Sequence, residues 1–174
     1  MKRNMGFTLI ELMITIVLAV VVISLAVPSF QETIRTNRLA TQTNQFVSAL
    51  NLARSEAIKR GVRVTVCRSG DQTSCGTGSF EEGWIVFIDP NNNADIDAGE
   101  QVINVAEVTA GEIMITGNAT VADFVSFTAD GISRLPSGAF QAGTFEIRVP
   151  SHDEGRNVII NSTGRVRTEK IEVI

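Results

Sequence analysis

The 174-residue sequence contains no tyrosine, one histidine and only two cysteines. The absence of tyrosine excludes no class of protein. The scarcity of histidine excludes more, because His152 lies between Ser151 and Asp153 and residues adjacent in a chain cannot form a catalytic triad. Phosphate-binding loops, dinucleotide fingerprints and metal-ligand clusters are also absent. The sequence therefore predicts a protein that is not an enzyme and has no cofactor.

Basic residues are missing from the middle of the chain. Residues 71–130 hold eleven acidic side chains and no Lys or Arg, whereas residues 1–70 hold nine basic and three acidic ones. Residues 132–174 hold six basic and five acidic ones. The net charge of -4 thus conceals a surface that we expect to be segregated by sign.

Charge is almost absent from residues 7–27, where Glu11 is the only charged side chain. In a helix that rises about 1.5 Å per residue, this span is about 31 Å long, which matches the hydrocarbon core of a bilayer. A secretory signal would have a shorter apolar centre and a cleavage site of small residues, whereas Pro28-Ser29-Phe30 follows here. A buried core helix rarely holds so many apolar residues. A simple signal anchor stays open on hydropathy alone, although it does not explain Glu11.

The residues at the start of this span, Gly6-Phe7-Thr8-Leu9-Ile10-Glu11, resemble the prepilin signature of type IV pilins and type II secretion pseudopilins. The resemblance implies that a prepilin peptidase cleaves between Gly6 and Phe7 and that Phe7 becomes the N-methylated terminus. Residues 1–6 are then a leader peptide, and residues 7–27 a transmembrane and filament-core helix. Because Lys2 and Arg3 favour a cytoplasmic N-terminus, we expect a single-pass inner-membrane protein with a periplasmic domain that later enters a pilus or pseudopilus.

Glu11 is the most unusual residue of the apolar span. A carboxylate inside a membrane is costly unless it finds a partner. Glu11 lies one helical turn beyond Phe7, so it can approach its own terminal amine or that of a neighbouring subunit. The resemblance implies the neighbour and makes Glu11 an assembly contact. A tolerated charge near the membrane interface is the alternative.

Beyond the apolar span, residues 28–61 show a helical, amphipathic pattern. An apolar stripe begins at Phe30 and Ile34, and Gly61 is a typical helix end. The stripe continues at spacings of four, three and four through Phe46, Leu50, Ala53 and Ala57. We expect this segment to continue the membrane helix and to pack on a sheet, with a kink favoured at Pro28.

After Gly61 the apolar pattern alternates with period two, which predicts strands. The fold class is α+β: a long N-terminal helix packed on an antiparallel β-sheet domain of residues 62–174, as in pilins. Asp130-Gly131 and Thr163-Gly164 predict two hairpins near the end of the chain. We expect strands near residues 62–66, 84–88, 101–105, 112–116, 124–128, 144–149, 157–160 and 164–168.

Two further segments narrow the resemblance. Gly83-Trp84-Ile85-Val86-Phe87, followed by Asp89 and an Asn-rich loop, resembles the H-type minor pseudopilins and the FimT and FimU minor pilins. The resemblance runs on through residues 161–167. It implies a minor subunit of the GspH/FimT/FimU family that sits at a filament tip or primes assembly. Its expected partners are other pilins or pseudopilins, the prepilin peptidase and the inner membrane.

Cys67 and Cys75 have seven residues between them, in a segment expected to be exported. An oxidising compartment and a Gly-containing loop favour a local structural disulfide. Two thiols and the distant His152 are too few ligands for a metal site. Two free thiols are the remaining alternative.

The Asn-rich loop has the spacing of a twelve-residue calcium loop. Ala94 occupies the position that prefers Gly, and strands rather than helices flank the loop. Asn and Asp are also common in ordinary turns, so a solvated loop is favoured over a calcium site. The candidate oxygen ligands are Asp89, Asn91, Asn93, Asp95, Asp97 and Glu100.

Gly164-Arg165-Val166-Arg167 matches the Gly-Arg-x-Arg motif of FimT-type minor pilins, which the resemblance associates with DNA binding during natural transformation. On a strand, Arg165 and Arg167 project from one face and can bridge successive phosphates. Lys170, Arg156 and Arg148 are candidates to extend this DNA-binding patch. The alternative is a polar strand end in a purely structural H-type pseudopilin of a type II secretion system.

Overall fold

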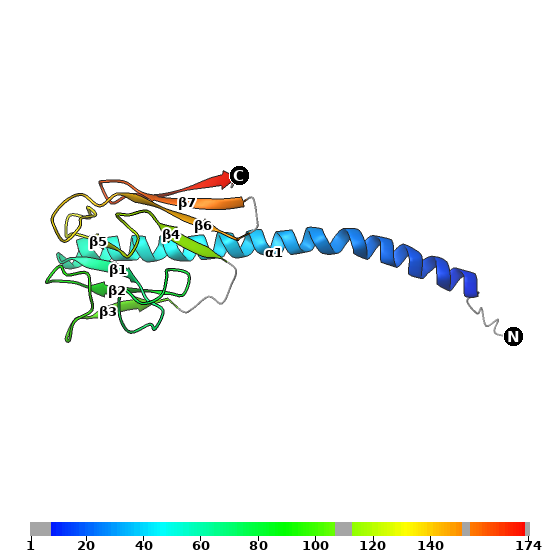
Figure 1. Ribbon diagram of the computed structural model, residues 1–174, viewed down its shortest axis with the longest axis horizontal. Helices are drawn as coiled ribbons and strands as arrows, with labels where there is room; N and C mark the ends of the chain where they lie inside the picture. The colour runs from blue at the N-terminus through cyan, green and yellow to red at the C-terminus, as the bar shows by residue number, and fades with distance from the viewer. Residues whose placement is uncertain (1–7, 107–112, 151–153, 173–174) are drawn as a thin grey trace. The chain divides into compact units, whose positions relative to one another are not determined.

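The structure is a computed structural model that describes residues 8–106, 113–150 and 154–172. The chain divides into two units, Met1–Arg38 and Leu39–Ile174. The helix α1 runs without interruption over Leu9–Arg60, through Pro28, and so belongs to both units (Figure 1). It ends where Gly61 adopts a φ of 66°, a conformation that glycine tolerates at a helix C-terminus.

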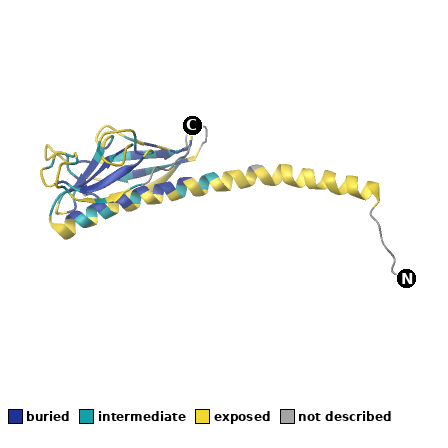
Figure 2. Ribbon diagram, turned by 90° about the horizontal axis from the view of Figure 1, so that it is seen from below, coloured by how far each residue is buried: buried dark blue, intermediate teal, exposed yellow. Residues whose placement is uncertain are grey.

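From Leu9 to Val27, within the first unit, α1 has apolar side chains on every side. Its large hydrophobic residues are exposed, as Leu18 is at 60% and Val22 at 64%. Figure 2 shows this stretch as continuously exposed. Among the described residues, α1 is the one helix long and apolar enough to cross a membrane.

The second unit contains the remainder of α1 and eight strands in two antiparallel sheets (Figure 1). The first sheet has the order β3-β2-β1-β5, and the second has the order β4-β6-β7-β8. The expected antiparallel β domain is confirmed, but its strands form two sheets rather than one. The strands are β1 (Val64–Arg68), β2 (Trp84–Ile88), β3 (Val102–Val105), β4 (Met114–Gly117), β5 (Phe124–Phe127), β6 (Gly143–Arg148), β7 (Glu154–Ile160) and β8 (Val166–Glu172).

Of the two predicted hairpins, one forms. Thr163-Gly164 lies in the turn between β7 and β8, which pair over their full lengths from Glu154↔Glu172 to Ile160↔Val166. At Asp130-Gly131 the chain also turns back on β5, but only in part. Phe127 and Ser133 form an antiparallel bridge across the turn, and no full strand follows it.

The core forms where the last part of α1 meets both sheets. Phe46 contacts the rings of Phe80, Trp84 and Phe145 edge to face, with centroids 4.7 to 5.4 Å apart. Figure 2 shows buried residues on the strands and on one side of this part of the helix. The helix contributes Leu39, Phe46, Leu50, Ala53 and Ala57 to the core.

The apolar stripe of α1 therefore begins later than the sequence pattern predicts. Phe30 and Ile34 are 67% and 37% exposed, whereas Leu39 is 3% exposed. Spacing along a helix identifies an apolar face, but burial also requires a strand to cover it. The buried stripe starts at Leu39, where the second unit begins.

Candidate functional site

The start of α1 places Glu11 in a reciprocal contact with Thr8. The backbone N–H and the hydroxyl of Thr8 both donate to Glu11 Oε2 at 3.0 Å. The backbone N–H of Glu11 donates to Thr8 Oγ1 at 3.3 Å. This is a capping box, which satisfies amide groups that have no partner within the helix. Gly6 and Phe7, the predicted cleavage site, lie outside the described residues.

The Gly-Arg-x-Arg segment begins in a turn that Asn161 organises. Asn161 Oδ1 accepts hydrogen bonds from the backbone N–H groups of Thr163 and Arg165, at 3.1 and 2.9 Å. Gly164 has a φ of 73°, and a Cβ on it would lie 2.3 Å from the carbonyl oxygen of Gly131. Glycine is therefore required at position 164 both by its conformation and by the close approach of another turn.

The turn that receives Gly164 is itself fastened to α1. Arg54 Nε donates to the carbonyl oxygen of Gly131 at 2.9 Å. A Cβ on Gly131 would lie 2.7 Å from Ile58 Cδ1. The C-terminal part of α1 therefore holds the loop at Gly131 in place. This loop contacts Gly164 and so positions the start of the Gly-Arg-x-Arg segment.

Arg165, just before β8, and Arg167, within it, are both exposed, and their spacing of two puts them on one face where the chain is extended. Arg167 Nη1 lies 3.1 Å from Glu169 Oε1, in an ion pair whose side chains are 68% and 47% exposed. Such an exposed pair is weak, at about 0.2–1 kcal/mol, so a phosphate can compete for the guanidinium.

Lys170 does not extend this patch, contrary to the prediction. It is an odd number of residues from Arg167, so it projects from the opposite face of β8, directly across from Arg156 on β7. Arg148 on β6 pairs with Gly155 on β7, which in turn pairs with Ile171 on β8. Because Ile171 is four residues from Arg167, the side chain of Arg148 lies on the same face of the sheet as Arg167. Its guanidinium is already in an ion pair with Glu146 at 3.2 Å.

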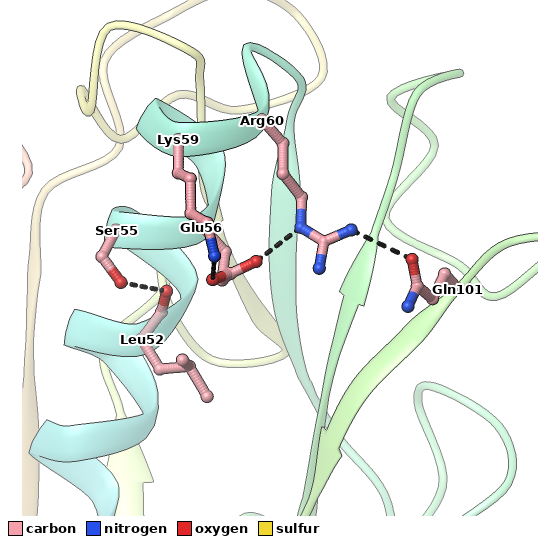
Figure 3. A network of polar contacts seen from close by, with 6 residues as sticks. All are labelled: Leu52, Ser55, Glu56, Lys59, Arg60 and Gln101. Atoms are coloured by element: carbon pink, nitrogen blue, oxygen red, sulfur yellow. Dashed lines mark hydrogen bonds and ion pairs between the residues drawn. The ribbon is translucent and has the colours of Figure 1, made fainter.

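The C-terminal end of α1 is tied to the start of β3. Arg60 Nε lies 2.5 Å from Glu56 Oε2, and Arg60 Nη1 donates to Gln101 Oε1 at 3.0 Å (Figure 3). The hydrogen bond from Arg60 lowers the pKa of Glu56 below its usual value. This network anchors the edge of the first sheet to the helix.

Cys67 and Cys75 form a disulfide, with their Cα atoms 5.5 Å apart. The loop that it closes is organised by Asp71, which accepts hydrogen bonds from the backbone N–H groups of Thr73 and Ser74 and from the Ser74 hydroxyl. The hydroxyl of Ser74, followed by these backbone donors, lowers the pKa of Asp71 well below its usual value. The loop is therefore held by a covalent bond and by a carboxylate cap.

The Asn-rich loop is held together by hydrogen bonds of its own. The amide groups of Asn91 and Asn93 donate to Asp97 Oδ2, at 2.6 and 2.7 Å. Asp89 is buried, and its carboxylate accepts from the hydroxyl of Thr65 on β1 at 2.8 Å. Among the described residues, no group of three or more His, Cys, Asp or Glu is arranged to hold a metal ion.

The hydrogen bonds give the Asn and Asp residues of this loop a structural explanation. Asp95 and Glu100 contribute to the same turn, since their carboxylates accept from the backbone N–H groups of Ile96 and Asp97. Desolvation raises the pKa of Glu100. The calcium-loop hypothesis stays a prediction.

Comparisons with known proteins agree with this architecture. Residues 42–164 match the family described as type II transport protein GspH, and residues 1–27 match the prokaryotic N-terminal methylation motif. Crystal structures of the type IV minor pilin FimU of Pseudomonas aeruginosa, in two crystal forms, have a similar fold. One has a TM-score of 0.58 at 19% identity and covers 77% of this chain and 90% of FimU. The other has a TM-score of 0.56 at 18% identity and covers 75% and 92%.

A long helix with an apolar N-terminal half, followed by an antiparallel β domain, defines a type IV pilin-like protein. The chain belongs to the GspH family, whose match spans most of the second unit. It is thus a minor pilin or pseudopilin of a type IV pilus or a type II secretion system. Members of this family are structural subunits that assemble with other pilins after processing by a prepilin peptidase.

The sequence patterns missed several residues that build these sites. Thr8 was detectable, because Thr-x-x-Glu at a helix start is the spacing of a capping box. Asn161 also had a signal, since Asn at the start of a turn accepts from the backbone two residues on. Arg54 and Gly131 had none, because their contact joins segments 77 residues apart. His152 lies outside the described residues.

Proposed function

We propose that this chain is a tip-associated or assembly-priming minor subunit and that Glu11 is its assembly contact. The observation that carries the proposal is a charged side chain near the start of an otherwise apolar, exposed helical stretch of membrane length, inside the segment that matches the methylation motif. In a bilayer or a filament core, the Glu11 carboxylate favours a cationic partner, and an N-methylated amine of a neighbouring subunit supplies one.

The same proposal sets the orientation of the chain. Lys2 and Arg3 keep the N-terminus in the cytoplasm, and the second unit lies in the periplasm. The disulfide supports this orientation, because such bonds persist in oxidising compartments.

A fractionation experiment tests the assembly contact. Glu11→Ala is expected to insert into the inner membrane as the wild type does, but to be lost from sheared filaments or from the pseudopilus. Glu11→Asp, which keeps the charge, is the matched control and retains partial incorporation. Full incorporation of Glu11→Ala would contradict the proposal.

A second candidate function is DNA binding by Arg165 and Arg167. The observation that favours it is the pair of exposed residues Arg165, just before β8, and Arg167, within β8, directly after a turn held by Asn161. Two such groups at strand spacing can contact neighbouring phosphates. The competing function is that of a purely structural type II secretion pseudopilin, for which salt-dependent DNA binding is absent.

A further inference from the structure

The loop between β5 and β6 lies beside the end of α1 and carries an exposed aromatic ring (Figure 1). This ring belongs to Phe140, which is 57% exposed. Among the described residues of the second unit, Phe140 is the one exposed aromatic side chain. Single exposed apolar side chains are common on protein surfaces, so the surroundings of the ring decide what it can bind.

Arg134 lies against the Phe140 ring. Its guanidinium carbon is 4.5 Å from the ring centroid, and its Nη1 donates to the carbonyl oxygen of Gly138 at 2.9 Å. The guanidinium keeps its positive charge in these contacts, because neither the ring nor the carbonyl group is ionised. Phe140 is 57% exposed with the guanidinium in place, so ring surface remains for a further contact.

Backbone contacts hold the ring in position. Arg134 and Phe140 form an antiparallel bridge, and the backbone N–H of Gly138 donates to the carbonyl oxygen of Leu135 at 2.9 Å to close the turn between them. Gln141, the residue after Phe140, is fully buried. A ligand that meets a ring already held in place loses little conformational freedom, which favours binding.

The same loop touches the start of the Gly-Arg-x-Arg segment. A Cβ on Gly164 would lie 2.3 Å from the carbonyl oxygen of Gly131 and 3.2 Å from the backbone nitrogen of Ser133. Arg165 follows Gly164 in the chain, and Arg134 follows Ser133. The ring and its guanidinium therefore belong to a backbone segment that adjoins the candidate phosphate contacts.

Two further arginines donate to this loop. Arg54 Nε donates to the carbonyl oxygen of Gly131 at 2.9 Å, and Arg63 Nη1 donates to that of Arg134 at 2.8 Å. A carbonyl oxygen satisfies a donor without cancelling its charge, so both side chains add to the positive potential around the loop. Asp130 is the single acidic residue of residues 128–142 and offsets part of it.

We propose that Phe140 and Arg134 form a stacking site for an unpaired base of single-stranded DNA, beside the phosphate contacts of Arg165 and Arg167. This inference rests on the proposed DNA-binding function and names the form of DNA that the site takes. Proteins that bind single strands combine a basic surface for the backbone with aromatic rings on which bases stack. A base inside a duplex is stacked on its neighbours and must be unstacked before it can reach the ring.

Fluorescence anisotropy with the full chain in detergent micelles tests the stacking site. The probes are a labelled single-stranded oligonucleotide and the blunt duplex of the same sequence. Phe140→Ala is expected to weaken binding of the single strand at least about fivefold, because the stacking contact is lost. Binding of the duplex should weaken less than about twofold, since its bases are already stacked. Equal effects on the two probes would overturn the inference.

Two matched variants show whether the ring itself is needed. Phe140→Leu keeps an apolar side chain but has no aromatic face, so it is expected to lose as much affinity for the single strand as Phe140→Ala. Phe140→Trp keeps a ring and should bind the single strand at least as tightly as the wild type. Wild-type affinity in Phe140→Leu would show that the side chain makes an apolar contact of another kind, and stacking would then be wrong.

The salt dependence separates the ring from the arginines. Stacking on a ring releases no counterions, so Phe140→Ala should lower the affinity for the single strand at each salt concentration and leave the slope of log affinity against log salt unchanged. A smaller slope in Phe140→Ala would show that the substitution disturbs the phosphate contacts, and it would contradict the stacking site.

Failure of this inference is distinguishable from failure of the proposed DNA binding. If the wild-type chain binds neither probe, the DNA-binding function is wrong. If the wild type binds DNA and Arg165→Ala with Arg167→Ala reduces the salt slope, DNA binding stands. An unchanged affinity of Phe140→Ala for the single strand would then show that the stacking site alone is wrong.

Discussion

Gly164 and Gly131 approach so closely that a Cβ on Gly164 would lie 2.3 Å from the carbonyl oxygen of Gly131. The two glycines belong to turns far apart in the sequence, and each has a positive φ, of 73° and 76°. The Gly of the Gly-Arg-x-Arg motif therefore has a packing role that is independent of any contact by the two arginines.

Gly164→Ala is expected to destabilise the second unit by at least about 2 kcal/mol, because it combines a left-handed conformation with a backbone clash. Gly138→Ala is the matched control. Gly138 has a φ of 86° with nothing within 4 Å of its Cβ position, so only the conformational cost of about 1–2 kcal/mol applies. Urea unfolding followed by Trp84 fluorescence measures both. Equal losses in the two variants would show that the clash is relieved.

Replacing Thr8 distinguishes the two roles that Glu11 can have, which are capping its own helix and contacting a neighbouring subunit. Thr8→Val removes the hydroxyl of the capping box and is expected to weaken the helix start by about 1 kcal/mol. If Glu11 acts on a neighbouring subunit, Thr8→Val still enters filaments and Glu11→Ala does not. If both variants are lost from filaments to the same extent, capping alone explains Glu11. Sheared-filament yield at matched membrane levels is the measurement.

The two faces of β8 predict different effects on DNA binding. Arg165→Ala with Arg167→Ala is expected to reduce the slope of log affinity against log salt by about 2, because two phosphate contacts are lost. Arg156→Ala with Lys170→Ala removes the same charge from the opposite face and is expected to leave the slope largely unchanged. Fluorescence anisotropy of a labelled duplex, titrated with the full chain at several salt concentrations, gives both slopes. Equal effects would indicate non-specific attraction.

Asp71 predicts a loss of stability in acid. Hydrogen bonds from Ser74 and Thr73 lower its pKa in the folded state below the reference value of 3.8. The ionised form is therefore favoured by folding, so its contribution is present above that value and is lost as the pH falls towards the lowered pKa. Thermal unfolding between pH 6 and pH 2 is expected to show a smaller decline for Asp71→Asn than for the wild type. An equal decline in the melting temperature of both proteins would exclude the Asp71 carboxylate as a source of the acid instability.

Phe46 is the residue whose removal is expected to damage the core most. Phe46→Ala leaves the three rings around it without their common partner and should cost about 3–5 kcal/mol in unfolding free energy. Phe140 is the matched control, since it is 57% exposed and contacts Arg134 at 4.5 Å from its ring centroid. Phe140→Ala should cost less than about 1 kcal/mol. Urea unfolding distinguishes the two, and equal costs would contradict the central position of Phe46.

Local patterns in the sequence were sufficient for the elements themselves. The helix over Leu9–Arg60 follows from an apolar run that continues as an amphipathic pattern and ends at Gly61. Each predicted strand has a counterpart. Some, such as β6, alternate between core and solvent, whereas β1 and β2 are continuously buried apolar runs. The prepilin-like signature at residues 6–11 was equally local, and the match to the methylation motif agrees with it.

Pairing between distant segments decided the rest. Nothing local indicates that β5 joins β1 in the first sheet, or that only a short bridge follows the turn at Asp130-Gly131. Register puts Lys170 opposite Arg156, whereas its separation from Arg167 already follows from their odd spacing along β8. The sequence thus determined a membrane-length helix, a set of strands and the family signature, since these depend on periodicity and composition. Only the tertiary structure decided which side chains of different strands share a face and which glycines approach each other, because these depend on contacts between residues far apart in the chain.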